Sequence, residues 1–279
     1  MQDYTKSDYK KKGKELYDKL HLSSYPVAIK YIKSEDEVPK GYTRPSATGK
    51  KMSICQAFGM SRKWGMSYGI TYKDNFCTPA SLGHGWIPLS KEEMIESQVK
   101  QGWHKDIDAE RRRAEKLYDK LEDIIKEGFC GLICAPLMKT RFIPDTILVF
   151  GNGGQIMHVI HALTFEHDEK YAINSAFEGY GESCGKGGLR PFLSKKPQIV
   201  VPGAGDRAFA GIQEHEIGIG FPGFHLFYIM DNLFKSGGPM NIGYPMRQLL
   251  PLELDENITP GFKWVKEKME EMEEQKKTM

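Results

Sequence analysis

Three of the five cysteines stand where a hydrophobic core is not expected. Cys55 and Cys77 have serine, glutamine, asparagine or threonine close by, and Cys184 is followed by a Gly-Lys-Gly-Gly run. Glycine lets backbone amides approach a bound anion or the sulfur atoms of a metal cluster. The three thiols do not have the spacing of a compact zinc finger, so folding would have to assemble their site. We therefore predict that Cys55, Cys77 and Cys184 are metal ligands.

The residue types leave two kinds of metal centre open. His84 follows Cys77 by seven residues and would complete a tetrahedral Cys3His zinc site. Three cysteines alone would instead hold an iron–sulfur cluster with one iron open to a ligand. Thiolates suit both, so ligand type does not decide between them. The lack of a compact zinc spacing favours the iron–sulfur cluster, whose open position would bind a small anionic or sulfur-containing molecule.

A second candidate group follows the predicted strand at 198–202. Gly203 and Gly205 permit a tight turn, while Asp206 and Arg207 add a carboxylate and a guanidinium. Ligands of α/β proteins bind at the carboxyl ends of strands, and arginine can clamp a carboxylate or phosphate through two hydrogen bonds. We assign Gly203 and Gly205 to cofactor binding, and Asp206 and Arg207 to catalysis. Arg207 would orient the ligand, while Asp206 holds Arg207 or handles a proton.

Two other functions fit the same residues. In a metal-free thiol enzyme, one cysteine would be the nucleophile and His84 its base. Arg62 and Lys63, or Lys186, would supply the positive field that makes a thiol reactive. In a non-catalytic binding or accessory protein, the cysteines would be buried and reduced. A serine nucleophile is unsupported, because the sequence has no Gly-x-Ser-x-Gly elbow.

Packing and turns explain the other chemistry-bearing residues better than a site does. Cys130 and Cys134 lie four residues apart in a predicted strand, about 13 Å from each other, which is too far for one ion. The glycine-rich segment 151–155 matches no nucleotide-binding motif and reads as a strand-to-helix turn. His158 and His161 follow among apolar residues, which favours partly buried, hydrogen-bonded histidines.

Strands and helices must alternate to position these residues. The spacing of apolar residues predicts helices over 5–20, 53–66, 107–126, 224–234 and from the 151–155 turn to residue 164, and strands over 26–32, 131–137, 146–150, 198–202 and 216–221. Residues 64–86 are expected to form an irregular loop, and Ile107 to begin the buried stripe of its helix. This interleaving predicts an α/β or α+β fold with a mixed sheet flanked by helices. Residues 1–279 would form one compact domain, with an N-terminal helix within 1–24 and a charged helix or tail at 260–279.

Composition narrows the class of protein. Thirty-nine Lys and Arg nearly balance 37 Asp and Glu, a net charge of +2, which gives no support to nucleic-acid binding. The chain has neither an apolar run long enough to span a membrane nor the apolar segment of a signal peptide. An odd number of cysteines without a secretion signal indicates reduced thiols. We expect a cytoplasmic protein whose partner is a small molecule, and which can associate into a homo-oligomer.

Taken in order along the chain, short motifs resemble the domain of unknown function 169 family. They are Pro26-Val27-Ala28-Ile29, the segment from Cys55 through Ala57 to Gly65, Phe76-Cys77 followed by Leu82-Gly83, Ala135-Pro136-Leu137, the turn from Val149 to Gln155, Cys184, and the Gly203 to Arg207 run before Phe221-Pro222. The resemblance covers about residues 25 to 235. It implies a prokaryotic, largely anaerobe-associated protein without an assigned reaction. Cys55, Cys77 and Cys184 match the cysteine pattern of the family, whereas Cys130 and Cys134 are local additions.

Overall fold

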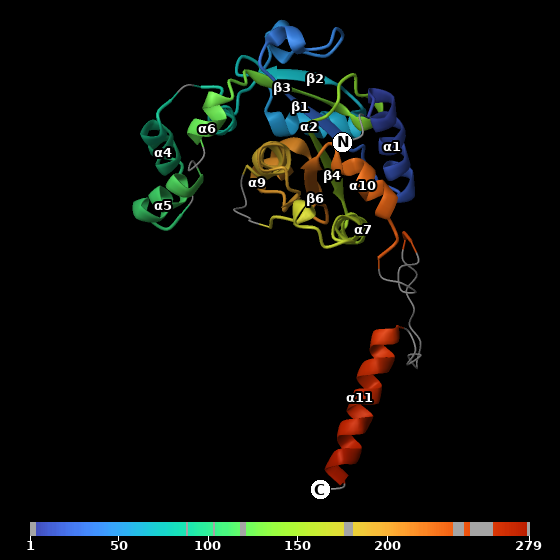
Figure 1. Ribbon diagram of the computed structural model, residues 1–279. Helices are drawn as coiled ribbons and strands as arrows, with labels where there is room; N and C mark the ends of the chain where they lie inside the picture. The colour runs from blue at the N-terminus through green and yellow to red at the C-terminus, as the bar shows by residue number, and fades with distance from the viewer. Residues whose placement is uncertain are drawn as a thin grey trace.

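A single six-stranded sheet organises the part of the chain that the computed structural model describes, which is residues 4–87, 89–102, 104–117, 121–175, 181–236, 243–245 and 259–277. The strand order is β2-β3-β1-β4-β6-β5. The strands are β1 (Val27–Ile32), β2 (Tyr68–Thr71), β3 (Gly131–Pro136), β4 (Thr146–Gly151), β5 (Gln198–Val200) and β6 (Ile217–Pro222). Figure 1 shows helices on both sides of this sheet.

The α-helices and helical turns connect and cover the strands. The α-helices are α1 (Lys6–Lys19), α2 (Ile54–Trp64), α3 (Thr78–Gly83), α4 (Lys91–Val99), α5 (Ile107–Leu117), α6 (Leu121–Lys126), α7 (Gly153–Leu163), α8 (Arg190–Ser194), α9 (Ala204–Ala210), α10 (His225–Asn232) and α11 (Pro260–Lys277). Short 3-10 turns are η1 (Glu35–Glu37), η2 (Pro45–Thr48), η3 (Leu137–Lys139) and η4 (Glu169–Tyr171), and η5 (Glu182–Leu189) is a π-helix.

The neighbouring strands of the sheet all pair antiparallel. In the centre, Ala28 of β1 lies opposite Ala135 of β3 on one side and Ile147 of β4 on the other. An antiparallel sheet covered by helices is an α+β architecture, which confirms one of the two predicted classes. The prediction of a mixed sheet was wrong, because a short apolar run carries no information about the direction of the strand beside it.

One face of the sheet packs against helices α1, α7 and α10; we call it the apolar face. Side chains that alternate along the strands point to it, because successive residues of a strand face opposite ways. Its strand residues are Ala28, Ile32, Ile133, Ala135, Ile147, Val149, Ile219 and Phe221, and its helix residues include Leu16, Ile156, Val159 and Leu226. This layer is the larger hydrophobic core of the protein.

The opposite face packs against α2, α9 and the π-helix η5; we call it the cysteine face. The intervening strand residues point here, among them Ile29, Leu132, Cys134, Leu148 and Phe150. Helix α2 lies on β1, β2 and β3, whereas η5 lies on β4, β5 and β6. The two elements therefore divide this face between them, and all three predicted metal ligands belong to segments on or beside it.

Two segments depart from the sequence-based expectations. Residues 64–86, predicted to be an irregular loop, include the edge strand β2 and helix α3, because β2 pairs with β3 despite its glycine. Ile107, predicted to be buried, is 63% exposed, whereas Ala114 of the same helix is fully buried. Ala114 joins Leu82, Met94, Ile95 and Val99 in a small core of helices beside the sheet. Residues 118–120 of the predicted helix over 107–126 lie outside the described residues.

The ends of the chain carry the helices that the sequence predicts. Thr5 caps α1: its side chain accepts a hydrogen bond from the backbone of Asp8, and the Asp8 carboxylate accepts one from Thr5 N–H in return. Helix α11 is charged, and its described side chains are exposed almost without exception. Figure 1 shows it lying away from the sheet. None of the described helices combines the length and apolarity needed to cross a membrane.

Candidate functional site

The three predicted ligands stand at or near the starts of helices. Cys55 is the second residue of α2, Cys77 immediately precedes α3, and Cys184 is the third residue of η5. Helix α2 begins here because the Ser53 side chain accepts a hydrogen bond from Gln56 N–H and the Gln56 side chain accepts one from Ser53 N–H. The Ser53 hydroxyl also lies 3.0 Å from the Cys55 sulfur.

Asn75 holds the backbone around Cys77. Its amide nitrogen donates to the Cys77 carbonyl at 2.8 Å, and its side-chain oxygen accepts from Cys77 N–H at 3.1 Å. The same amide donates to the Ser81 hydroxyl inside α3. These bonds pin Cys77 in one position, which is why a loop cysteine can form part of a defined site. The polar neighbours noted in the sequence are therefore the groups that position the thiol.

Cys184 lies in a π-helix, a rare geometry that occurs mostly at functional sites. The glycines after it have different reasons to be there. A Cβ on Gly220 of β6 would come within 2.0 Å of the Gly187 carbonyl oxygen, so η5 touches the sheet through bare backbone. Gly188 faces the Tyr31 hydroxyl and the Phe58 ring, whereas Gly185 has open space. Packing therefore explains Gly187 and Gly188, and only Gly185 leaves room for a ligand.

Electrostatic coupling links the three thiols to one another and to Asp206. Burial raises the pKa of Cys184 well above its ordinary value, and the negative charges of Cys55, Asp206 and Cys77 raise it further. Burial likewise raises the pKa of Cys55 to about 12, with Asp206 and Cys77 contributing. The pKa of Cys77 is raised too, by burial and then by Asp206. Such couplings act at short range, so these four acidic groups lie near one another.

Asp206 ties the two halves of the site together. Its Oδ2 accepts hydrogen bonds from Gly203 N–H at 3.1 Å and from Ser183 N–H at 3.3 Å, which joins the start of α9 to η5. Burial raises the pKa of this carboxyl, and the bonds from Ser183 and Gly203 oppose that shift. Gly203 thus contributes its backbone to the site, while Gly205 is exposed.

Arg207 is directed elsewhere. Its Nη1 donates to the Gln213 carbonyl at 2.7 Å and lies 3.4 Å from the Glu214 carboxylate. These contacts brace the loop between α9 and β6. The expectation that Arg207 orients a ligand beside the cysteines therefore requires that it leave these contacts.

His84 and two aromatic side chains form a buried wall next to Cys184. The His84 ring lies 6.1 Å from the Tyr31 ring and 5.2 Å from the Trp86 ring, centroid to centroid. Within the described chain, the Tyr31 hydroxyl, His84 Nε2 and Trp86 Nε1 are buried and have no hydrogen-bond partner. Buried polar atoms without partners are costly, so this wall is suited to hold a ligand.

The protonation state of His84 follows from its contacts. Nδ1 lies 2.7 Å from the Ala80 carbonyl, which can only accept, so Nδ1 carries the proton and Nε2 keeps a lone pair. Burial lowers the pKa of His84 to about 4, while backbone groups of Ala80 and Cys184 act in the opposite direction. His84 is therefore neutral at pH 7, with the hydrogen-bonded arrangement that metal-binding histidines commonly have.

The three cations that could activate a thiol all have hydrogen-bond or ion-pair partners in the structure. Arg62 makes a bidentate, fully buried ion pair with Glu216 at 2.7 and 2.6 Å. Lys63 donates to the Gly211 carbonyl, and Lys186 pairs with the buried Glu182 at 3.0 Å. Because their pKa values are raised, and because Arg62 and Lys186 are paired with carboxylates, no thiol of the site is favoured as a free thiolate at pH 7.

The described residues do not form a preformed site for a single metal ion. Among the described residues, no three His, Cys, Asp or Glu side chains are grouped to hold one ion. Tetrahedral zinc requires sulfur atoms about 4 Å apart, whereas a cluster with its cysteines on different irons holds them farther apart. Cys184 is buried, Cys55 and Cys77 are partly buried, and a Cβ on Gly185 would meet nothing within 4 Å.

The other two cysteines and the α7 histidines behave as packing residues. Cys134 is fully buried, 3.5 Å from the Ser61 hydroxyl, and Cys130 is half-buried at the end of β3. His158 packs against the Phe234 ring at 4.9 Å. The 151–155 turn is closed by Asn152 and Gln155, which cap α7 reciprocally. All five cysteines are free of disulfides.

Sequence reasoning missed Tyr31, and a signal for it was available. Strand alternation places Tyr31 on the same face as Ile29, and a buried tyrosine hydroxyl calls for a partner. Tyr31 stacks on Phe192 at 5.0 Å as well as facing His84, so it is held rigidly. Trp86 lies just after α3 and could not be placed without the fold.

Comparison with known proteins identifies a family but no activity. A family model described as uncharacterised ArCR, domain of unknown function 169, matches residues 15–232. An uncharacterized protein of Methanocaldococcus jannaschii is 24% identical over 218 residues, which cover 77% of this chain and 89% of that protein. No solved structure matches the chain. The chain belongs to the domain of unknown function 169 family, as its motifs indicated.

Proposed function

We propose that this member of the domain of unknown function 169 family is a cytoplasmic metalloprotein in which Cys55, Cys77 and Cys184 bind an iron–sulfur cluster. One iron would remain open to a small anionic or sulfur-containing ligand. When bound, the cluster would supply an iron centre able to exchange an electron or polarise that ligand. The reaction itself is left open by this proposal.

The observation that carries the proposal is the convergence of three thiols from distant parts of the chain. Cys184 lies 107 residues after Cys77, yet the charges of Cys55 and Cys77 both act on it. The thiolate forms of Cys55 and Cys184 are disfavoured by the neighbouring negative charges, because the charges of Asp206 and Cys77 raise the pKa of both. A bound cation would reverse that repulsion and stabilise the thiolates.

Other residues have supporting roles in this scheme. Asp206 holds the backbone of Ser183 and Gly203, which positions Cys184 relative to α9. The Tyr31 hydroxyl and Trp86 Nε1 can donate hydrogen bonds to a ligand, and His84 Nε2 can accept one. The ligand would thus meet donors and an acceptor beside the metal. Arg207 would join only if its contacts with Gln213 and Glu214 opened.

The test is metal analysis of protein purified without oxygen. Iron and acid-labile sulfide in matching amounts, with a brown chromophore, are expected in the native chain. Replacing Cys55, Cys77 or Cys184 singly by serine should remove most of both. Cys130→Ser is the matched control, because Cys130 lies at the far end of a strand and should leave the metal in place. Full metal in all three site variants, or a native protein that binds none, would overturn the proposal.

A zinc site is the second candidate, and His84 favours it. Its Nδ1–H donates to the Ala80 carbonyl and leaves Nε2 as a lone-pair donor near Cys184. Zinc without colour, lost in His84→Asn as well as in the three cysteine variants, would establish Cys3His coordination. An iron–sulfur cluster predicts that His84→Asn keeps its iron. If the protein never binds metal, a ligand-binding role and a thiol enzyme remain as alternatives. Rapid alkylation of a single cysteine at neutral pH would favour the thiol enzyme, and uniformly slow alkylation would favour the ligand-binding role.

A further inference from the structure

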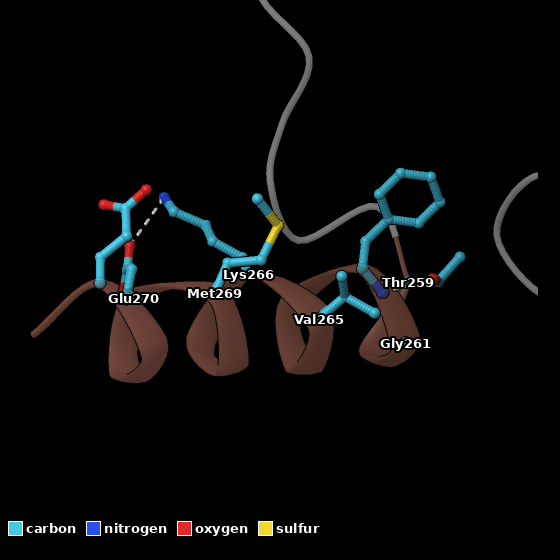
Figure 2. A pocket seen from close by; sticks show the side chains of 8 residues that line it. Thr259, Gly261, Val265, Lys266, Met269 and Glu270 are labelled. Carbon is cyan, nitrogen blue, oxygen red and sulfur yellow. Dashed lines mark hydrogen bonds and ion pairs between the residues drawn. The ribbon is translucent and has the colours of Figure 1, made fainter. Parts of the chain in front are cut away.

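Helix α11 carries an apolar stripe that the rest of the described chain leaves uncovered. Phe262, Val265, Met269 and Met272 are between 50% and 59% exposed. In Figure 2, Val265 and Met269 lie along one side of the helix, lining a surface hollow. Most helical stability in proteins comes from tertiary packing of an apolar face, and α11 exposes its apolar face. We therefore expect a partner surface to cover this apolar stripe.

The spacing of the stripe is that of a coiled coil. Successive apolar residues are three, four and three positions apart, from Phe262 through Val265 and Met269 to Met272. This is the a–d pattern of a heptad, with Phe262 and Met269 at a and Val265 and Met272 at d. Such a seam is narrower than the stripe by which a helix packs on a globular core. The pattern favours another helix as the occupant.

Two further observations bear on which partner covers the apolar stripe of α11. The family model matches residues 15–232, so α11 lies outside the region that the family model covers. The helix contains five lysines and five glutamates. A membrane-surface helix carries more basic than acidic residues on its polar face. In α11 the two kinds are equal in number, so this feature of a membrane-surface helix is absent.

We propose that α11 pairs with α11 of a second copy of this chain as a parallel, in-register coiled coil. In that arrangement Lys268 at position g lies near Glu273 at position e of the other copy, twice in each dimer. An antiparallel pairing of the same four apolar residues would set Lys268 against Lys268. The charge pattern thus selects the parallel orientation. The seam from Phe262 to Met272 spans fewer than two heptads, so the dimer is weak and depends on concentration.

Sedimentation analysis of the full chain over a wide concentration range tests this proposal. The native protein should shift from monomer to dimer, and Met269→Glu should weaken the dimer about tenfold or more. Trp264→Glu is the matched control, because Trp264 is 59% exposed but lies outside the seam. It should leave the dimer unchanged. Circular dichroism and metal content should be the same in every variant, since none of these side chains contacts the sheet.

Charge reversal tests the orientation. Lys268→Glu and Glu273→Lys should each weaken the dimer several-fold, and the double variant should recover it. In an antiparallel dimer, Lys268→Glu would replace one pair of like charges by another, so association would change little, and that result would rule out the parallel orientation. A monomer at all concentrations, a dimer indifferent to Met269→Glu, or a monomer that binds anionic vesicles through α11 would each overturn the proposal.

Discussion

The two faces of the sheet use the same strands but differ in what they bury. The apolar face packs α1, α7 and α10 on aliphatic and aromatic side chains. The cysteine face also buries Arg62 with Glu216, Lys186 with Glu182, Asp206 and the Cys184 thiol. Buried ion pairs are weak contributors to stability, so a face that carries several of them is not arranged for stability alone. The difference directs attention to the cysteine face as the functional side.

The apolar face has its own polar exceptions, which differ in kind. His158 and His225 are fully buried and pack against aromatic rings, and His158 also lies 6.5 Å from the His161 ring. His225 lies 4.7 Å from the Tyr171 ring and 4.5 Å from the Phe224 ring. These histidines belong to a packed aromatic layer, whereas the polar groups of the cysteine face include thiols and carboxylates.

The largest stability effect should come from the buried ion pair of the cysteine face. Arg62→Ala leaves Glu216 buried without its partner and removes the guanidinium from the Phe150 ring, 4.9 Å away. We expect a loss of about 5 kcal/mol in the free energy of unfolding, measured by urea denaturation. The double variant Arg62→Met with Glu216→Leu should recover most of it. If Arg62→Ala lowers the free energy of unfolding no more than the double variant does, the ion pair has no special role in the stability of this face.

A cavity in the apolar face should cost stability without touching the site. Leu16 of α1 is fully buried in the larger core, so Leu16→Ala should lower the free energy of unfolding by about 4 kcal/mol. The folded variant should keep the metal content of the native protein. Loss of metal in proportion to stability would show that the two faces are not functionally distinct.

Overpacking between η5 and the sheet should affect both stability and the site. Gly220→Ala places a methyl group 2.0 Å from the Gly187 carbonyl, so η5 must move. We expect the free energy of unfolding to fall by about 3 kcal/mol. Because Cys184 moves with η5, we also expect reduced metal binding. Gly185→Ala is the control for stability, since its Cβ meets nothing within 4 Å. Unchanged metal in Gly220→Ala would mean that the position of η5 does not govern the site.

The smallest effect is a pH dependence of the apolar face. Burial lowers the pKa of His225 to about 4, so the folded protein keeps it neutral while the unfolded chain protonates near pH 6.5. Stability is therefore lost as pH falls from about 6.5 towards 4. His225 should contribute about 2 kcal/mol of this loss between pH 7 and 5. His225→Phe, compared with the native chain in urea at each pH, should flatten the profile by that amount; an unchanged profile would contradict the assignment.

Local structure was largely predictable from the sequence. Strands β1, β3 and β4 follow from short apolar runs, and α1, α2 and α7 from apolar spacing and reciprocal caps such as Ser53 with Gln56. Edge strand β2 was missed because it has only four residues, including a glycine, and becomes a strand by pairing with β3. Ile107 was misassigned because helical spacing does not say which end of a stripe meets the core.

The sequence by itself determined most of the secondary-structure elements, the residue types able to do chemistry and the family, because caps, periodicity and short motifs are local properties. Only the tertiary structure decided that the sheet is antiparallel, that Cys55, Cys77 and Cys184 share one region with Asp206, that Tyr31 and His84 line it, and that Arg207 braces a loop. These outcomes depend on strand pairing and on the packing of η5 against β6. Such contacts join residues far apart in the chain, and no local pattern encodes them.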